Sequence, residues 1–252
     1  MNTALVSSLR DLADAALNLV YPAVCQVCGD ERATAAEGYV GPKCRARVRY
    51  LLPPYCNRCG LPYSGEISGP FECANCADVK LHFRAARSAV VADAMMLDLA
   101  GRYKYQPAPW FEPFLAGLLI AEARPALKAE RWDFIVPVPL HPVKLREREF
   151  NQAERLAAWL GPATNIPVNA RLLRRVKLTV TQTRLSREQR AANVSGAFAF
   201  CGRQKLSGQK IVLLDDVMTT GATTNACAAA LRRAGAGEIC VWTVARAVTT
   251  GT

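Results

Sequence analysis

One stretch of the sequence combines residue types that can bind a sugar phosphate: Ile211-Val-Leu-Leu-Asp-Asp-Val-Met-Thr-Thr-Gly-Ala-Thr223. Its first four residues form a continuous apolar run, which is typical of a buried parallel strand. Asp215 and Asp216 follow directly, at the end of the strand where open α/β sheets bind ligands. Burying two carboxylates for stability alone would be costly. They can instead accept hydrogen bonds from the vicinal hydroxyls of a ribose.

The residues after these acids predict an anion-binding turn: Thr219, Thr220, Gly221, Ala222 and Thr223. Their small side chains let the backbone approach a ligand, and hydroxyl and N–H groups face it where a helix begins. Such a cup suits a phosphate monoester, so the acids and the cup together describe a ribose 5-phosphate site. The patterns GxxxxGK[ST] and GxGxxG are absent, which argues against a Walker A loop and a dinucleotide fingerprint.

Cysteines predict a metal site nearer the N-terminus. Seven of the ten cysteines lie between Cys25 and Cys76. Because the N-terminal residues do not resemble an export signal, these cysteines indicate metal rather than disulfides. Two CxxC pairs, separated by thirteen residues, supply the four thiolates that tetrahedral zinc prefers. The expected zinc ligands are Cys56, Cys59, Cys73 and Cys76.

A second cysteine set is one sulfur short. Cys25, Cys28 and Cys44 supply three thiols, and Gly41 stands where a matching CxxC pair would place its first cysteine. A zinc ion here would need a fourth ligand from elsewhere, and the alternative is a site that no longer binds metal. The candidates for that ligand are His82, Asp30 and Glu37. We therefore expect one firmly bound zinc ion per chain.

The charge of the chain is concentrated in its C-terminal part. The 252 residues carry a net charge of +11, but residues 1–80 hold equal numbers of basic and acidic side chains. Residues 141–190 hold eleven Lys and Arg against four Asp and Glu. Such a stretch indicates a polyanionic partner or a solvated basic surface, and charge alone does not separate the two. No run of 18 apolar residues occurs, so we expect no membrane span and a cytoplasmic protein.

The sequence pattern that must position these groups changes after residue 80, from a Cys-rich segment to alternating strand and helix patterns. Residues 1–20 have the pattern of an amphipathic helix, residues 21–80 that of a metal-organised ribbon, and residues 81–252 form the third region. In this last region apolar runs alternate with helical patterns, which predicts an α/β domain with a mostly parallel sheet. The expected strands are 86–92, 134–139, 211–214 and 239–245. The expected helices are 95–105, 111–123, 153–160 and 222–234.

The stretch 211–223 resembles the phosphoribosyl pyrophosphate (PRPP) signature of type I phosphoribosyltransferases, and other stretches resemble the competence protein F (ComF/GntX) family. These are Lys104-Tyr105, Val136-Pro-Val-Pro-Leu-His-Pro142, Leu145-Arg-Glu-Arg-Glu-Phe-Asn-Gln152, and Gln182 with Arg190-Ala-Ala-Asn-Val-Ser-Gly-Ala-Phe198. The N-terminal cysteines resemble that family's double zinc ribbon. Gly41 departs from the ribbon pattern, and Glu149 stands where the family usually has Gly. The implied fold is a type I phosphoribosyltransferase-like parallel sheet with a small N-terminal zinc-ribbon domain.

The resemblance also implies a role for each group. Asp215 and Asp216 would be the catalytic residues that hold the ribose hydroxyls, and the cup 219–223 would bind the 5′-phosphate. Mg²⁺ would be held mainly by PRPP oxygens. The implied pyrophosphate ligands are His141, Lys144, Arg146, Arg148 and Arg190. Further cations that could close over the site are Lys177, Arg184 and Arg187, whereas Arg171, Arg174 and Arg175 are expected on a solvated or nucleic-acid-facing surface.

The implied reaction is attack of a nitrogen on C1 of the ribose with loss of pyrophosphate, which needs positioning and charge neutralisation rather than a covalent nucleophile. Two other functions stay open. One is binding of single-stranded DNA along the basic 141–190 stretch during DNA uptake, with other competence proteins as implied partners. The other is PRPP sensing without turnover. No motif in the sequence names the acceptor base or amine.

Overall fold

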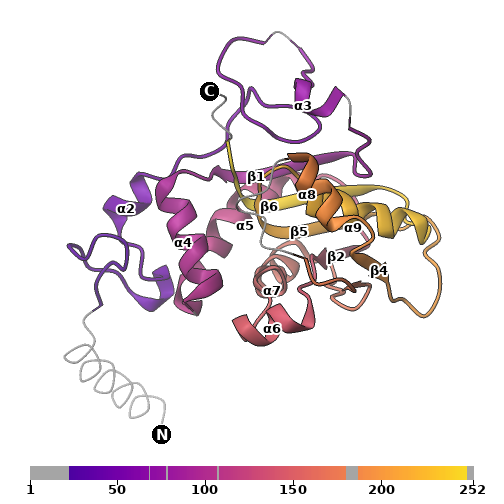
Figure 1. Cartoon of the computed structure of the whole chain (residues 1–252). Helices are drawn as coiled ribbons and strands as arrows, with labels where there is room; N and C mark the ends of the chain where they lie inside the picture. The colour runs from indigo at the N-terminus through magenta and orange to yellow at the C-terminus, as the bar shows by residue number, and fades with distance from the viewer. Residues whose placement is uncertain (1–22, 68, 78, 107, 180–186, 249–252) are drawn as a thin grey trace, which may run out of the picture.

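The computed structural model describes residues 23–248 except 68, 78, 107 and 180–186, so the expected N-terminal helix over 1–20 lies outside the described residues. In the described part, the centre is a four-stranded parallel sheet in the order β1–β6–β5–β2 (Figure 1). Its strands are β1 (Ala85–Val91), β2 (Phe134–Pro137), β5 (Ile211–Met218) and β6 (Ile239–Arg246). The α/β class with a parallel sheet, predicted from the sequence, is confirmed.

Helices cover both faces of this sheet (Figure 1). The apolar side chains of β5 alternate between the faces, because successive side chains of a strand point to opposite sides. Val212 and Leu214 pack in one core with three helices, and Ile211 and Leu213 pack in the other core. The first core contains α4 (Ala94–Tyr105), α5 (Glu112–Lys128) and α7 (Gln152–Thr164), and the second contains α9 (Ala222–Arg233) and the end of α8 (Arg187–Val194).

Several short elements were not foreseen from the sequence. An antiparallel pair lies apart from the main sheet, β3 (Leu173–Arg175) with β4 (Phe198–Phe200). The short helices are η1 (Ala35–Glu37), α2 (Pro42–Ala46), α3 (Ala74–Ala77), η2 (Pro109–Phe111) and α6 (Pro142–Arg148). None of the helices in the described ranges is long and apolar enough to cross a membrane.

β5 is longer than the apolar run that predicted it. Its pairing with β6 continues to Met218, which lies opposite Arg246. The strand therefore includes Asp215 and Asp216 instead of ending before them. The two carboxylates are held by a paired strand backbone, which fixes their directions more firmly than a loop would.

The Cys-rich segment covers the free edge of β1. The Ala86 N–H donates to the Arg58 carbonyl over 2.8 Å, and the Leu51 N–H donates to the Ala89 carbonyl over 3.0 Å. An uncovered edge strand would leave such groups unpaired. The ribbon is thus joined to the sheet by backbone hydrogen bonds.

A buried carboxylate fixes the helices beside the sheet. Glu112, 6% exposed at the start of α5, accepts hydrogen bonds from the Tyr103 hydroxyl (3.2 Å), Arg155 Nε (2.8 Å) and Trp159 Nε1 (2.7 Å). Tyr103 belongs to α4, and the other two donors belong to α7. This contact holds α4 against α7, and so sets the position of Lys104, the next residue of α4.

Candidate functional site

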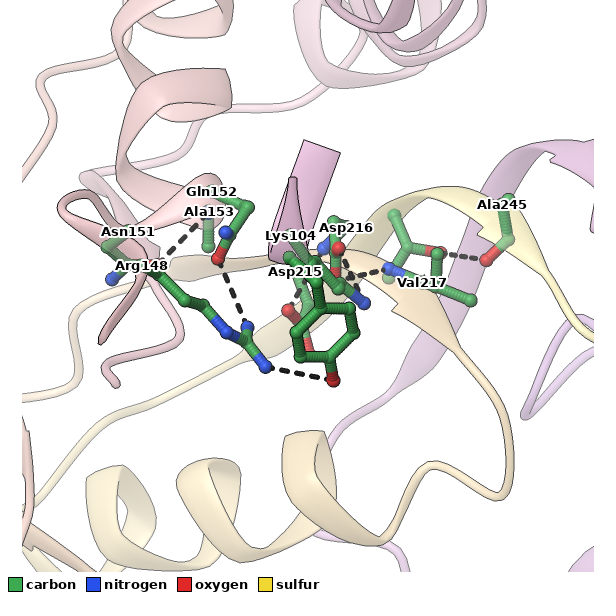
Figure 2. Close-up of polar contacts among 11 residues, drawn as sticks. Lys104, Arg148, Asn151, Gln152, Ala153, Asp215, Asp216, Val217 and Ala245 are labelled. Carbon is green, nitrogen blue, oxygen red and sulfur yellow. Dashed lines mark hydrogen bonds and ion pairs between the residues drawn. The ribbon is translucent and has the colours of Figure 1, made fainter. Parts of the chain in front are cut away.

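The carboxyl end of β5 opens into a cleft of about 470 Å³ that both aspartates line. Asp216 faces α4, where its Oδ2 lies 2.7 Å from Lys104 Nζ in an ion pair (Figure 2). Asp215 lies on the other side of the strand, where its charge acts on Arg175. Its Oδ1 accepts the Asp216 N–H over 2.9 Å. Adjacent residues therefore present two carboxylates that diverge into one cleft.

The two acids differ in their electrostatic surroundings. Burial raises the pKa of Asp215 to about 7, and the nearby charge of Asp216 acts in the same direction. Burial also lowers the pKa of Lys104, but the charge and hydrogen bond of Asp216 outweigh it and leave that pKa above its ordinary value. Asp216 and Lys104 thus form a stable charge pair, while Asp215 titrates near neutral pH.

The turn after β5 forms one wall of the cleft. Gly221 caps α9 with φ +79°, a left-handed conformation that glycine adopts readily, and a Cβ there would lie 2.6 Å from Met218 Cε. Thr220 lines a second cavity of about 250 Å³ instead, and its Oγ1 accepts the Ala222 N–H over 3.4 Å. Of the predicted cup, the cleft is lined by Thr219, Gly221, Ala222 and Thr223, joined by Thr224.

The opposite wall is cationic and contains Lys144 and Arg148, two of the predicted pyrophosphate ligands. The Arg148 guanidinium lies 4.7 Å from the ring centroid of Tyr105 and donates to the Tyr105 hydroxyl (3.1 Å) and Gln152 Oε1 (3.3 Å) (Figure 2). Arg148 Nε and Gln152 Nε2 are buried and have no hydrogen-bond partner within the described residues. Buried donors of this kind are costly unless something supplies an acceptor.

The other predicted pyrophosphate ligands do not line the cleft among the described side chains. His141 caps α6, where its Nδ1 accepts the Val143 N–H over 3.3 Å. Arg146 is exposed on the same helix. Arg190 lies in α8, but its side chain, like that of Arg187, falls outside what the structure describes, as does all of Arg184.

The sequence predicted Arg175 on the surface with Arg171 and Arg174, and for Arg175 this prediction is wrong. It lines the cleft, its guanidinium lies 5.4 Å from the ring centroid of Phe198, and burial lowers its pKa. Its buried Nε has no hydrogen-bond partner in the described part of the chain. Arg171 and Arg174 are exposed as expected. Alternation along β3 directs Arg175 inward, but a three-residue strand leaves no pattern that the sequence could reveal.

The predicted zinc ligands come together. Cys56, Cys59, Cys73 and Cys76 are buried, and their sulfur atoms lie within 4.8 Å of one another. The Cys73 N–H also donates to Cys56 Sγ over 3.3 Å, a bond that supports a thiolate. Four thiolates in one cluster fit a closed tetrahedral zinc site.

The incomplete set has a candidate fourth ligand, Glu31, that was not predicted from the sequence. The Glu31 carboxylate lies with the sulfur atoms of Cys25, Cys28 and Cys44 within 4.8 Å, whereas His82, Asp30 and Glu37 are not in this group. A Cβ built on Gly41 would lie 2.4 Å from the Glu31 side chain. The carboxylate therefore fills the space that a cysteine at position 41 would need. Its oxygens accept the N–H groups of Lys43 (2.8 Å) and Cys44 (3.0 Å), which fixes it in that place.

Comparison with known proteins agrees with this arrangement. The double zinc ribbon domain model matches residues 16–80. "Competence protein F" of Haemophilus influenzae is 33% identical over 212 residues, which cover 81% of this chain and 89% of that protein. The chain belongs to the competence protein F family. "DNA utilization protein YhgH" of Salmonella typhi is 32% identical over 236 residues, covering 90% of this chain and 99% of that one.

Among solved structures, the glutamine PRPP amidotransferase of B. subtilis is similar to 51% of this chain. The match covers 25% of the amidotransferase chain, with 22% sequence identity and a TM-score of 0.34. Glu149, a position where the resemblance led us to expect glycine, has a special backbone conformation. Glu149 ends α6 with φ +66°, the left-handed conformation that favours glycine. Its side chain is exposed and does not line the cleft.

We expect the two aspartates of this competence protein F homologue to have opposite effects on stability. The pKa of Asp215 is higher in the folded than in the unfolded chain, so the folded state binds its proton more tightly, and stability falls as pH rises from about 4 to about 7. Asp215→Asn should therefore raise the free energy of unfolding at pH 8.5 and raise it less at pH 6. Asp216→Asn should lower it, by up to about 3 kcal/mol, because Lys104 loses its partner. Urea unfolding of the zinc-loaded protein measures both. Equal effects of the two variants would contradict this assignment.

We expect two zinc ions per chain on purification and one after mild chelation. The site with Glu31 has three sulfur ligands and one oxygen, so it should release zinc more readily than the tetrathiolate site. Glu31→Ala should reduce the initial count to one, while Glu37→Ala, which removes a nearby carboxylate, should not. Glu31→Ala combined with Gly41→Cys should make both ions resistant to the chelator. Elemental analysis gives the counts, and an unchanged count in Glu31→Ala would exclude this carboxylate as a ligand.

Proposed function

We propose that this chain binds PRPP with Mg²⁺ in the cleft at the end of β5, and that it serves the uptake or use of DNA. The observation that supports PRPP most directly is the distribution of charge in the cleft. Carboxylates that can accept hydrogen bonds lie at the end of β5, and donors that lack acceptors among the described residues lie on the wall formed by α6, α7 and β3. PRPP carries sugar hydroxyls and phosphate groups, which match these two kinds of partner.

Each part of the ligand has a place in this proposal. Asp215 and Asp216 accept hydrogen bonds from the ribose hydroxyls, and the turn 219–223 at the start of α9 binds the 5′-phosphate. The pyrophosphate lies against the cationic wall. That wall presents Lys144, Arg148, Gln152 and Arg175. Mg²⁺ would neutralise pyrophosphate oxygens when bound, with Asp215 as the protein carboxylate available beside them.

The chemistry proposed for this cleft is transfer of the phosphoribosyl group to a nitrogen. The lone pair of the acceptor nitrogen forms a bond to C1 while the bond from C1 to pyrophosphate oxygen breaks, and its electron pair leaves with pyrophosphate. The acceptor's proton passes to water. The residues bind and orient the reactants and neutralise the leaving group. A pyrophosphate-release assay with PRPP, Mg²⁺ and a panel of nucleobases and amines tests turnover, and PRPP binding without release would favour sensing.

A second activity, binding of single-stranded DNA, is favoured by the outward side of β3. Arg171 and Arg174 are exposed, and no ion pair engages either one among the described residues. Free cations of this kind can contact phosphates. The names of the relatives, competence protein F and DNA utilization protein, support a role with DNA.

We expect Arg175→Met to weaken PRPP binding roughly 10- to 150-fold, the equivalent of one charge-assisted hydrogen bond. Binding of ribose 5-phosphate, which lacks the pyrophosphate, should change little. Arg174→Met is the matched control, because it removes the same charge from the neighbouring exposed position. Calorimetry of all three proteins with both ligands measures this. Equal losses for PRPP and ribose 5-phosphate would remove Arg175 from the pyrophosphate site.

We expect Arg171→Ala with Arg174→Ala to weaken binding of single-stranded oligonucleotides. The double variant should also flatten the dependence of binding on salt, by roughly 0.7 in the logarithmic slope for each phosphate that the protein no longer neutralises. Arg124→Ala, an exposed arginine of α5, is the control and should leave binding unchanged. Fluorescence anisotropy between low and moderate salt measures both quantities. If the wild-type protein does not bind at low salt, direct DNA contact is wrong.

A further inference from the structure

Arg246, the last residue of β6, is a buried cation that the proposed function does not use. It is 5% exposed, and no ion pair engages it among the described residues. A buried guanidinium is costly unless its N–H groups and its charge are compensated. The compensation must therefore come from the groups that its N–H atoms contact.

Those contacts join two regions that are far apart in the sequence. Nη1 donates to the carbonyls of Met218 (3.2 Å), Thr219 and Ala247 (2.8 Å). Nε donates to the Cys59 carbonyl (3.2 Å), and Nη2 approaches Cys59 Sγ at 3.8 Å. One side of the guanidinium thus holds the turn that precedes α9, and the other side holds a ligand of the tetrathiolate metal site.

The metal site supplies the missing negative charge. Four thiolates around one Zn²⁺ leave a net charge of about −2, and Cys59 is one of the four. When the cluster is loaded, Arg246 lies beside an anionic centre that attracts it. Without the metal ion, the turn that carries Cys59 loses the bonds that hold it together, and Arg246 loses a fixed partner on that side.

The position of Cys59 is itself fixed against the sheet. The next residue, Gly60, has φ +67°, and a Cβ there would lie 2.7 Å from the Ala86 carbonyl oxygen of β1. β1 pairs with β6 in register, with Val91 opposite Arg246. The turn that carries Cys59 therefore cannot move without displacing β1. Because β1 is paired with β6, Arg246 would be displaced too.

We propose that Arg246 is a positioning residue that couples the tetrathiolate zinc site to the turn 218–221, so that the turn is ordered for anion binding only when this zinc is bound. The consequence for PRPP rests on the proposed function. Coupling between two sites is reciprocal, so a ligand held by the turn should also slow the loss of this zinc. The zinc ribbon would then affect ligand binding through Arg246 without contacting the ligand itself.

The first test needs no ligand. Hydrogen exchange of amides 219–224 is measured in wild type with zinc, in wild type after removal of zinc, and in zinc-loaded Arg246→Met. We expect exchange to be faster by roughly 5- to 150-fold in the second and third samples. Removing zinc from Arg246→Met should add little further, because the link is already broken. Arg232→Met, which removes another arginine that donates to backbone carbonyls, should behave as wild type.

Amides of β5 and β6 report whether each variant is folded, and Arg246→Lys is the second variant if Arg246→Met does not fold. Lysine keeps the positive charge but has a single amino group, which cannot contact both the turn 218–221 and Cys59. The turn amides of Arg246→Lys should therefore exchange faster than those of wild type. Unchanged turn amides in folded, zinc-depleted wild type would overturn the coupling. So would equal responses to zinc in wild type and both Arg246 variants.

A second test separates this inference from the proposed function. The rate of zinc transfer to a chromogenic chelator is measured with and without PRPP and Mg²⁺, and we expect slower transfer with PRPP in wild type and no difference in Arg246→Met. If PRPP does not bind wild type but the turn still responds to zinc through Arg246, the proposed ligand is wrong and the coupling stands. If PRPP binds and neither the exchange nor the transfer depends on Arg246, the coupling is wrong and the ligand stands.

Discussion

Two adjacent carboxylates on a strand that runs into the core are the constraint on which the rest of this site depends. The strand directs Asp216 toward α4, where Lys104 neutralises it over 2.7 Å, and Lys104 is positioned in turn by the contacts that hold α4 to Glu112. No ion pair engages Asp215 among the described side chains, and burial raises its pKa to about 7. The negative charge at the end of β5 is therefore only partly compensated by the protein. Cations on the opposite wall are separated from it by the cleft, which suits a ligand that has hydroxyls at one end and phosphates at the other.

What the sequence could predict was local. The apolar run of β5, the start of α9 and the four cysteines of the complete set each lie within a few residues of their partners or follow a regular spacing. The strand and the helix are confirmed, and the four sulfur atoms come together. Anion binding by the turn before α9 stays a prediction. Lys104 stood out only through resemblance, because its partner is more than a hundred residues away. Glu31 was missed because no spacing marks it as a ligand, and only the packing of its side chain against Gly41 shows that it occupies the place of a cysteine.

The ribbon packs as part of the α/β domain, because its cysteines belong to the two cores of the sheet. Cys25 and Cys44 pack in the core that contains α4 and α5, whereas the four cysteines of the complete set pack in the core on the opposite face of the sheet. Each half of the ribbon thus completes a different core. A metal ion that organises one half also organises the packing of one face of the sheet, because small cysteine-rich loops have too little apolar surface to fold alone.

The distribution of unpaired donors gives the strongest physical reason to expect an anionic ligand. Within the described residues, four buried side-chain N–H groups have no hydrogen-bond partner, and three of them, on Arg148, Gln152 and Arg175, line the cleft. Folded proteins rarely leave such donors unpaired, and each one raises the free energy of the ligand-free state. They come from three different elements, α6, α7 and β3, so a single local distortion does not explain them. All three residues line the cleft, so an anion bound there is the kind of partner that would supply acceptors to their side chains.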